Sequence, residues 1–168
     1  TSDMLYILDN PEVREAYFPS GAHEYAVEPA RREDGPAIEF IIDRHEGPEA
    51  AKTLKTWWMH APETFYVARD SEDKVAGLMC MFDPAPINPA FLQEDPVLRG
   101  FCDHLRRNPV PNNQRVLFDR RWLDLEAGEM EAPVTGAIFL DCKRMYMAMR
   151  PNLRRVYVSM CDQTFAPV

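Results

Sequence analysis

The segment from Gln114 to Asp162 constrains the fold more than any other part of the sequence. It holds a strand-like stretch at 115–125, an acidic loop at 126–131 and a second strand-like stretch at 154–160. Between the loop and the second stretch, apolar residues recur at three- and four-residue steps, the spacing of a helix with one core-facing side. These residues are Val134, Ile138, Cys142, Met145 and Met149. The segment therefore predicts a strand, a loop, a helix beginning at Pro133, and a second strand.

Further strands and helices are predicted before this segment. A strand is expected at 23–28, followed by a helix from Asp34 to Gly47 and another between Pro48 and Pro62. The proline at each helix start occupies a position where its missing amide hydrogen is not needed. Residues 64–69 and 75–82 predict a hairpin, because a polar turn separates two apolar runs. The predicted order is strand, helix, helix, hairpin.

Length and composition indicate a single domain. The 168 residues are 46% hydrophobic, which is enough apolar surface for a sizeable core. We expect an N-terminal extension at 1–22 with a short helix at 11–17, a domain at 23–162 and a tail at 163–168. Because the sequence starts at Thr1 without methionine and stops soon after a strand, we also expect it to be a domain of a larger protein.

Residues 83–113 are rich in proline and separate the hairpin from the strand that begins near Arg115. They contain one predicted helix, from Pro96 to Arg107, with Asp95 as its N-terminal cap. Apolar residues recur along one side of that helix. We therefore interpret this segment as an ordered insertion that covers or builds a pocket.

The net charge of the chain limits the classes of partner that we expect it to bind. The net charge of −8 argues against a nucleic-acid backbone or an anionic membrane surface, since both require a basic field. No apolar run approaches the roughly 20 residues that span a bilayer. The four cysteines form no CxxC pair and lie mostly in apolar stretches, so we expect reduced core thiols and a soluble, cytoplasmic protein. The four histidines lack the spacing of a metal site.

The order of elements resembles the GCN5-related N-acetyltransferase (GNAT) fold, from about His23 to Asp162. Residues 24–38 resemble the opening strand and helix of the family, and residues 64–77 resemble its second and third strands. The resemblance implies an α/β (α+β) fold with a mixed, mostly antiparallel, twisted central sheet flanked by helices.

The resemblance also implies a coenzyme site. In this family a central strand diverges from its neighbour and its backbone pairs with the pantetheine arm of acyl-coenzyme A. Amides at the start of the following helix hold the pyrophosphate. Carried over to this sequence, the strand positions are Leu123 and Leu125, and the helix positions are Thr135, Gly136 and Ala137. Acetyl-coenzyme A or another acyl-coenzyme A is then the expected cofactor, and a small-molecule or protein amine is the expected acceptor.

The phosphate motif departs from the family pattern, which is Arg or Gln, two residues, Gly, one residue, and Gly or Ala. Laid over Glu131–Gly136, only Gly136 fits. Glu131 stands where a basic or amide side chain is expected, Pro133 removes an amide hydrogen, and Val134 replaces a glycine that lets amides approach phosphate. Glu126 and Glu129 add negative charge. The sequence therefore predicts a degraded coenzyme site.

Acetyl transfer to an amine requires a base, and the resemblance implies that carboxylates near the diverging strand supply it. The candidates are Asp124 and Glu126, with Tyr157 on the polar side of the last strand as a third catalytic candidate. Asp119 and Asp124 are separated by an odd number of residues, so regular alternation predicts that they face opposite sides of the sheet. The alternative is that Asp119 pairs with Arg120 or Arg121 on a solvated face and that Glu126 to Glu131 favour the positive end of the following helix. For Tyr157, the alternative is a half-buried strand residue whose hydroxyl finds a backbone partner.

Three hypotheses on function follow. The first is a degenerate ligand-sensing or interaction module of a larger protein. The second is an active acyl-coenzyme A-dependent N-acetyltransferase, and the third is a structural or dimerisation domain. Because the closing strands of the family are missing after Val168, we expect a homodimer or a partner domain to complete the sheet.

Overall fold

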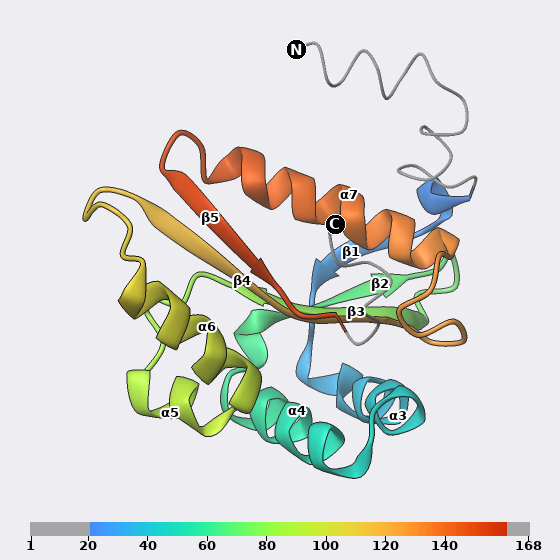
Figure 1. Cartoon of the computed structure of the whole chain (residues 1–168). Helices are drawn as coiled ribbons and strands as arrows, with labels where there is room; N and C mark the ends of the chain where they lie inside the picture. Colours follow the sequence, from blue (N-terminus) through green and yellow to red (C-terminus); the bar gives the residue numbers. More distant parts are fainter. Residues whose placement is uncertain (1–20, 161–168) are drawn as a thin grey trace.

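A computed structural model describes residues 21–160 of the protein. They form a mixed α/β fold, a five-stranded and mostly antiparallel sheet flanked by helices (Figure 1). The strands are β1 (Ala26–Pro29), β2 (Phe65–Arg69), β3 (Val75–Phe82), β4 (Arg115–Asp124) and β5 (Leu153–Val158), and they lie in the sheet in this order. Neighbouring strands from β1 to β4 pair antiparallel, whereas β4 and β5 pair parallel. The fold class predicted from the sequence is confirmed.

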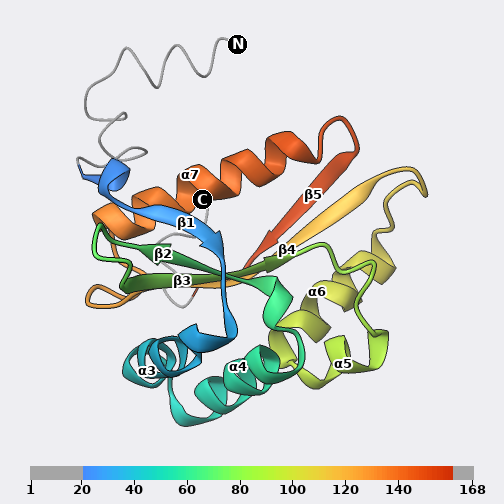
Figure 2. The same ribbon diagram turned by 180° about the vertical axis from the view of Figure 1, so that it is seen from behind.

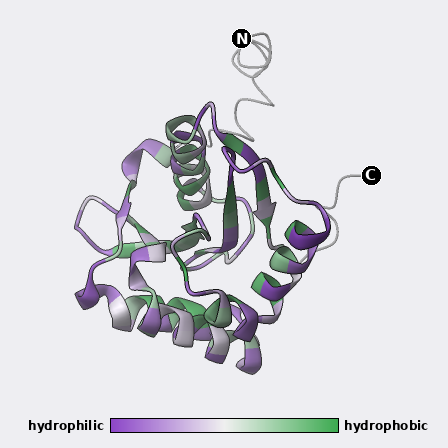
Figure 3. Ribbon diagram, turned by 90° about the vertical axis from the view of Figure 1, so that its left-hand side faces the viewer, coloured by the Kyte–Doolittle hydropathy of each residue, from purple (hydrophilic) through white to green (hydrophobic). Residues whose placement is uncertain are grey.

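Helices cover both faces of the sheet. One face carries α3 (Gly35–His45), α4 (Pro48–His60), α5 (Pro89–Glu94) and α6 (Pro96–Arg107), and the other carries α7 (Pro133–Ala148) alone (Figures 1 and 2). Short 3₁₀ turns at Ala22–Glu24, Arg32–Asp34 and Pro62–Thr64 precede β1, α3 and β2. Because β4 and β5 are parallel, the chain crosses between them through α7. Figure 3 shows hydrophobic residues along the strands and on the adjoining helix surfaces.

The two faces of the sheet have separate cores. The core under the four-helix layer is centred on Trp57, Phe65 and Phe118, which are almost completely buried. The core under α7 includes Met79, Leu117, Trp122, Val134 and Ile138. The sheet is therefore buried on both sides, which explains why β3 is a continuous apolar run rather than an alternating one.

Most element boundaries agree with the sequence analysis. α6 spans the predicted Pro96–Arg107, and β4 begins and ends within the predicted strand. The first predicted strand is shorter than expected, because residues 22–24 form a 3₁₀ turn. Helix α5 was not predicted. The expected N-terminal helix at 11–17 and Cys161 lie outside the described residues.

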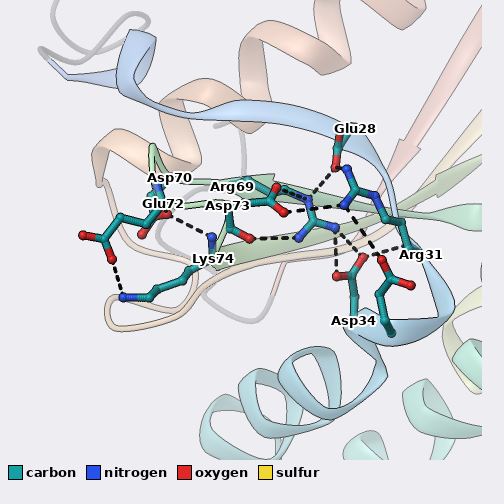
Figure 4. Close-up of polar contacts among 9 residues, drawn as sticks. Glu28, Arg31, Asp34, Arg69, Asp70, Glu72, Asp73 and Lys74 are labelled. Carbon is teal, nitrogen blue, oxygen red and sulfur yellow. Dashed lines mark hydrogen bonds and ion pairs between the residues drawn. The ribbon is translucent and has the colours of Figure 1, made fainter.

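A buried ionic cluster holds β1, the start of α3 and the β2–β3 turn together (Figure 4). The Arg69 guanidinium donates to both carboxylate oxygens of Asp34, at 2.7 and 2.8 Å, and to Glu28 at 2.5 Å. Asp34 also accepts a hydrogen bond from the Arg31 amide at 2.7 Å. Arg69 and Asp34 are both buried. Each charge is thus paired and hydrogen-bonded, the condition under which buried ions are tolerated.

The three cysteines of the described residues are free thiols. Cys80 and Cys142 are buried free thiols, and Cys102 is a partly buried free thiol. Burial raises the pKa of all three thiols, so they are poor nucleophiles. Within residues 21–160, no helix combines the length and apolar character required to cross a bilayer.

Candidate functional site

The parallel pair β4–β5 opens an edge in the sheet. Pairing runs from Arg115 opposite Leu153 to Asp119 opposite Val158, and the Ser159 amide then donates to the Asp119 carbonyl at 3.1 Å. Beyond Asp119, β4 continues to Asp124 with no described strand on that side. On that side, backbone groups of this part of β4 have no strand partner among residues 21–160.

Trp122 presents backbone groups on this edge that bond to no other residue of the described range 21–160. The Leu125 amide donates to the Ala76 carbonyl at 2.8 Å, so Leu125 belongs to a hydrogen-bonded pair of the β3–β4 ladder. In an antiparallel ladder such pairs alternate with non-bonded pairs, and the backbone groups of Trp122 and Asp124 then point away from β3. Asp124 uses its groups on Gly128, at 2.7 and 3.2 Å. Trp122 thus offers one amide and one carbonyl to the open edge.

A bulge at Arg120 changes the side-chain directions along β4. Cys80 is opposite Arg121 and Met81 is opposite Asp119, so Arg120 is an extra residue on β4. A bulge of this kind disturbs the alternation of side chains and bends the strand. Arg120 and Arg121 both point to the four-helix face, where Arg120 donates to Asp95 and Arg121 contacts Glu46 and Glu129.

The bulge places Asp119 and Asp124 on the same face of the sheet. Asp119 is opposite Met81, which packs in the α7 core, and Asp124 is opposite Gly77, whose added Cβ would meet Val134 of α7. Cross-strand partners share a face. The prediction that the two carboxylates face opposite sides was wrong, because it assumed an unbroken two-residue period.

Asp119 is a buried carboxyl group that lacks a full set of partners. It is 2% exposed, and its Oδ1 atom has no hydrogen-bond partner within residues 21–160. Burial raises the pKa of Asp119 to about 8, an effect that Arg121 partly offsets. At neutral pH the group is therefore mainly protonated. The alternative that Asp119 pairs with Arg120 or Arg121 on a solvated face was wrong, since all three residues are buried.

Asp124 and Glu126 both have interaction partners in the folded protein. Asp124 Oδ1 accepts hydrogen bonds from the amides of Glu126 and Ala127, both at 2.6 Å, and so closes the loop after β4. Gly128 in this loop has a φ of 66°, which favours glycine. Glu126 is exposed and forms an ion pair with Arg44 of α3. Both carboxylates thus have partners in the folded protein, one in a loop turn and one in an exposed ion pair.

Tyr157 lies on the four-helix face and not in the core under α7. It is 9% exposed and packs against Phe101 and Phe118, with ring centroids 5.2 Å away in both cases. Its hydroxyl accepts from Arg155 Nη1 at 3.0 Å and lies 3.0 Å from His104 Nδ1. The Tyr157 hydroxyl hydrogen can therefore donate to a neutral His104 ring. The hydroxyl does find partners, as the alternative for Tyr157 expected, but they are side chains.

The candidate cofactor positions on β4, Leu123 and Leu125, do not present their backbone groups to the open edge. By the same alternation that exposes Trp122, the backbone groups of Leu123 and Leu125 point toward β3. The Leu123 side chain is fully buried, and the Leu125 carbonyl lies 2.9 Å from His45 Nε2. Trp122, one residue before Leu123, is the position that faces the open edge.

The candidate positions on α7 form its first turns. Thr135 Oγ1 accepts from the Ala132 amide at 2.8 Å, and the Gly136 amide makes the first helical bond, to the Ala132 carbonyl at 3.0 Å. Ala137 is buried. The amides of Val134 and Thr135 precede that first bond and donate to no backbone carbonyl among residues 21–160. These two amides are the donors that the helix start offers.

The acidic loop is less repulsive than its sequence indicates. Glu129 is paired with Arg121, and Glu126 is paired with Arg44, so two of the three carboxylates are neutralised. Glu131 is exposed and makes no ion pair with the described residues. The Val134 side chain points inward and approaches Gly77, away from any ligand at the helix start.

Comparisons with known proteins found similarity to solved structures and to no protein family. No protein-family model matches the sequence, and no curated protein matches it at a significant level. Among solved structures, the chain is similar to the C-terminal condensation domain of Ebony in complex with beta-alanyl-dopamine, at 18% sequence identity and a TM-score of 0.49. The similarity covers 74% of this chain and 69% of that chain. It identifies no ligand and no activity here, so the function rests on the residues of the chain itself.

Proposed function

We propose that this chain is a GNAT-like domain that works as a ligand-sensing or interaction module and has no acetyltransferase activity. The strand order, the parallel β4–β5 pair and the crossover through α7 support the GNAT-like assignment, because they reproduce the arrangement that the sequence resemblance implies. The end of the β4–β5 pairing at Asp119, before β4 itself ends, adds to this support, because the resemblance implies a central strand that diverges from its neighbour.

The proposed loss of activity is supported by one observation: each of the three catalytic candidates already has an interaction partner within the protein. Asp124 closes its own loop, Glu126 pairs with Arg44, and Tyr157 is held by His104 and Arg155. A general base must be free to reach the proton it removes. The start of α7 also offers few donors for pyrophosphate, since Pro133 has no amide hydrogen and Glu131 adds an unpaired negative charge.

An active acyl-coenzyme A-dependent N-acyltransferase is the second candidate function. The free amide and carbonyl of Trp122 favour it, because a pantetheine arm needs such groups. The pairing of Glu126 and Glu129 with arginines also removes most of the expected repulsion toward phosphate. A third candidate, a dimerisation domain, is favoured by exposed apolar residues on α7, namely Phe139, Leu140 and Met147.

Titration calorimetry with acetyl-coenzyme A separates the first two candidates. We expect no heat of binding and no rise in melting temperature, whereas binding at micromolar affinity would overturn the proposed loss of the coenzyme site. The double variant Glu131→Gln, Pro133→Gly restores a neutral amide side chain and a backbone donor. If these two residues are the cause, this variant gains measurable binding. Glu33→Gln, an exposed change on another turn, is the matched control.

Turnover and mass measurements complete the comparison. Thiol release with acetyl-coenzyme A and a panel of amines tests the active alternative, in which Glu126→Gln or Asp124→Asn lowers the rate. Light scattering tests the dimerisation alternative, in which Phe139→Glu converts a dimer to a monomer. We expect no thiol release from the unmodified protein.

A further inference from the structure

The segment between β3 and β4 forms one wall of a pocket. The pocket has a volume of about 520 Å³ and lies between the loop after β3, helices α5 and α6, and the first residues of β4. Sites for small ligands typically have volumes of roughly 300–1,000 Å³. Trp122 and the open edge lie toward the other end of β4. The pocket is therefore separate from the candidate coenzyme site.

The walls of this pocket are mainly apolar and well supported. Leu92, Val116 and Phe118 are buried residues of the core under the four-helix layer. Ile87, Leu105 and Val110 are partly buried and pack against that core. A ligand here would cover apolar surface on residues that the fold already holds in place, so little ordering is needed on binding.

Gln114 places an unpaired acceptor in the pocket wall. Its Oε1 atom is buried and has no hydrogen-bond partner within residues 21–160. Its backbone amide is bonded to the Pro111 carbonyl at 2.8 Å, which fixes the residue next to β4. A buried acceptor without a partner costs about 1–3 kcal/mol. Because the atom is buried, a ligand reaches it when the Gln114 side chain turns toward the pocket, and an N–H or O–H of the ligand that then donates to Oε1 recovers that energy.

Arg115 places an available positive charge at the rim of the pocket. Its Nε atom donates to Asp83 Oδ2 at 2.7 Å, and its Nη groups make no hydrogen bond with the described residues. Asp83 Oδ1 accepts from the Ala85 amide at 2.9 Å, so both Asp83 oxygens are engaged. The free side of the guanidinium can hold the two oxygens of a carboxylate.

We infer that this pocket binds a small monoanionic molecule with an apolar body and one N–H or O–H donor. The apolar body lies against Leu105, Val110 and Phe118, the donor bonds to Gln114 Oε1, and the anionic group pairs with Arg115. Aromatic or branched aliphatic N-acyl amino acids have this chemistry. The inference is independent of the proposed function, because none of these residues lies at the open edge of β4.

Fluorescence of 8-anilinonaphthalene-1-sulfonate, an aromatic anion with one N–H, tests the pocket. We expect saturable binding of one dye per chain and its displacement by N-acetyl-phenylalanine. N-acetyl-phenylalanine amide, which lacks the negative charge, should displace the dye roughly fivefold less well. Absence of saturable binding would overturn the inference.

Three variants assign the binding to this pocket. Cys102→Phe fills the pocket from α6 and should abolish dye binding. Gln114→Leu removes the acceptor, and Arg115→Gln removes the charge; each should weaken N-acetyl-phenylalanine about fivefold. Arg154→Gln changes an exposed arginine of β5 outside the pocket and is the matched control. Cooperative urea unfolding of each variant shows that the fold is kept.

The pattern across the ligands distinguishes this site from nonspecific dye binding. In Arg115→Gln, the acid and the amide should compete equally, because the charge contact is gone. Unchanged binding in Cys102→Phe, or equal losses in Arg115→Gln and Arg154→Gln, would contradict the inference. Backbone amide shifts on adding N-acetyl-phenylalanine give an independent readout, and they should concentrate in α6 and the first half of β4.

Discussion

The Nε atom of Arg120 donates to the Oδ2 atom of Asp95 at 2.7 Å, and both side chains are buried. This bond joins the bulge of β4 to the first turn of α6. The other oxygen of Asp95 accepts from the amides of Val97, at 2.8 Å, and Leu98, at 3.4 Å. A single carboxylate thus caps the helix and neutralises the extra residue of the strand.

Replacing Asp95 with alanine should destabilise the protein strongly. The change removes the helix cap, worth about 1 kcal/mol, and leaves the Arg120 charge buried without a partner, a loss of roughly 3–5 kcal/mol. We expect the midpoint of urea unfolding to fall sharply. Asp103→Ala, which removes an exposed partner of Arg106 on the same helix, should cost less than about 1 kcal/mol. Equal losses in the two variants would contradict the double role of Asp95.

Gly77 is a position where β3 tolerates no side chain. A Cβ atom added there would lie 2.5 Å from Val134 Cγ1 and 2.9 Å from the Leu123 carbonyl oxygen. Gly77→Ala should therefore destabilise the protein by about 1–3 kcal/mol through overpacking, as measured by chemical denaturation. Val134→Ala in the same chain should recover only part of the loss, because the carbonyl contact remains. Gly47→Ala is the control, since an added Cβ there meets nothing within 4 Å.

Local patterns in the sequence identified most of the fold. Helix α6 follows from Asp95 and Pro96 together with its apolar side, and α3 and α4 follow from prolines at their starts. Each of these signals acts within one or two turns of chain, so the sequence contains it directly. Helix α5 could not be predicted, because its six residues, Pro89–Glu94, are too few to show the periodic spacing of apolar residues that marks a helix.

The candidate site was harder to predict, because it depends on register. One extra residue at Arg120 moves Asp119 to the face of Asp124 and makes Trp122 the residue at the open edge. Nothing local marks a bulge formed by an arginine. The partners of Glu126 and Glu129, on α3 and β4, also come together only in the folded chain. The sequence alone therefore overstates the repulsion that the loop exerts on a phosphate group.

Asp119 should make stability depend on pH. Burial raises the pKa of its folded-state carboxyl from 3.8 to about 8, so between these values the folded protein holds a proton that the unfolded chain releases. The contribution of Asp119 to the free energy of unfolding then decreases as pH rises from about 4 to about 8, by up to roughly 1.4 kcal/mol per pH unit. Urea unfolding across this range measures the slope. Asp119→Asn should flatten it relative to the unmodified protein and to Asp103→Asn; an identical slope in all three would contradict a buried neutral carboxyl.

Tyr157→Phe distinguishes a structural hydroxyl from a catalytic one. The Tyr157 hydroxyl has Arg155 and His104 as partners, and both are open enough to solvent to bond with water after the change. We therefore expect a loss of about 1 kcal/mol in unfolding free energy and no change in thiol release with acetyl-coenzyme A and amines. Tyr66→Phe, at a partly buried tyrosine of β2, is the control for general loss of a hydroxyl. If the unmodified protein does release thiol and Tyr157→Phe lowers the rate tenfold or more while Tyr66→Phe does not, Tyr157 takes part in the reaction and the proposed loss of activity is wrong.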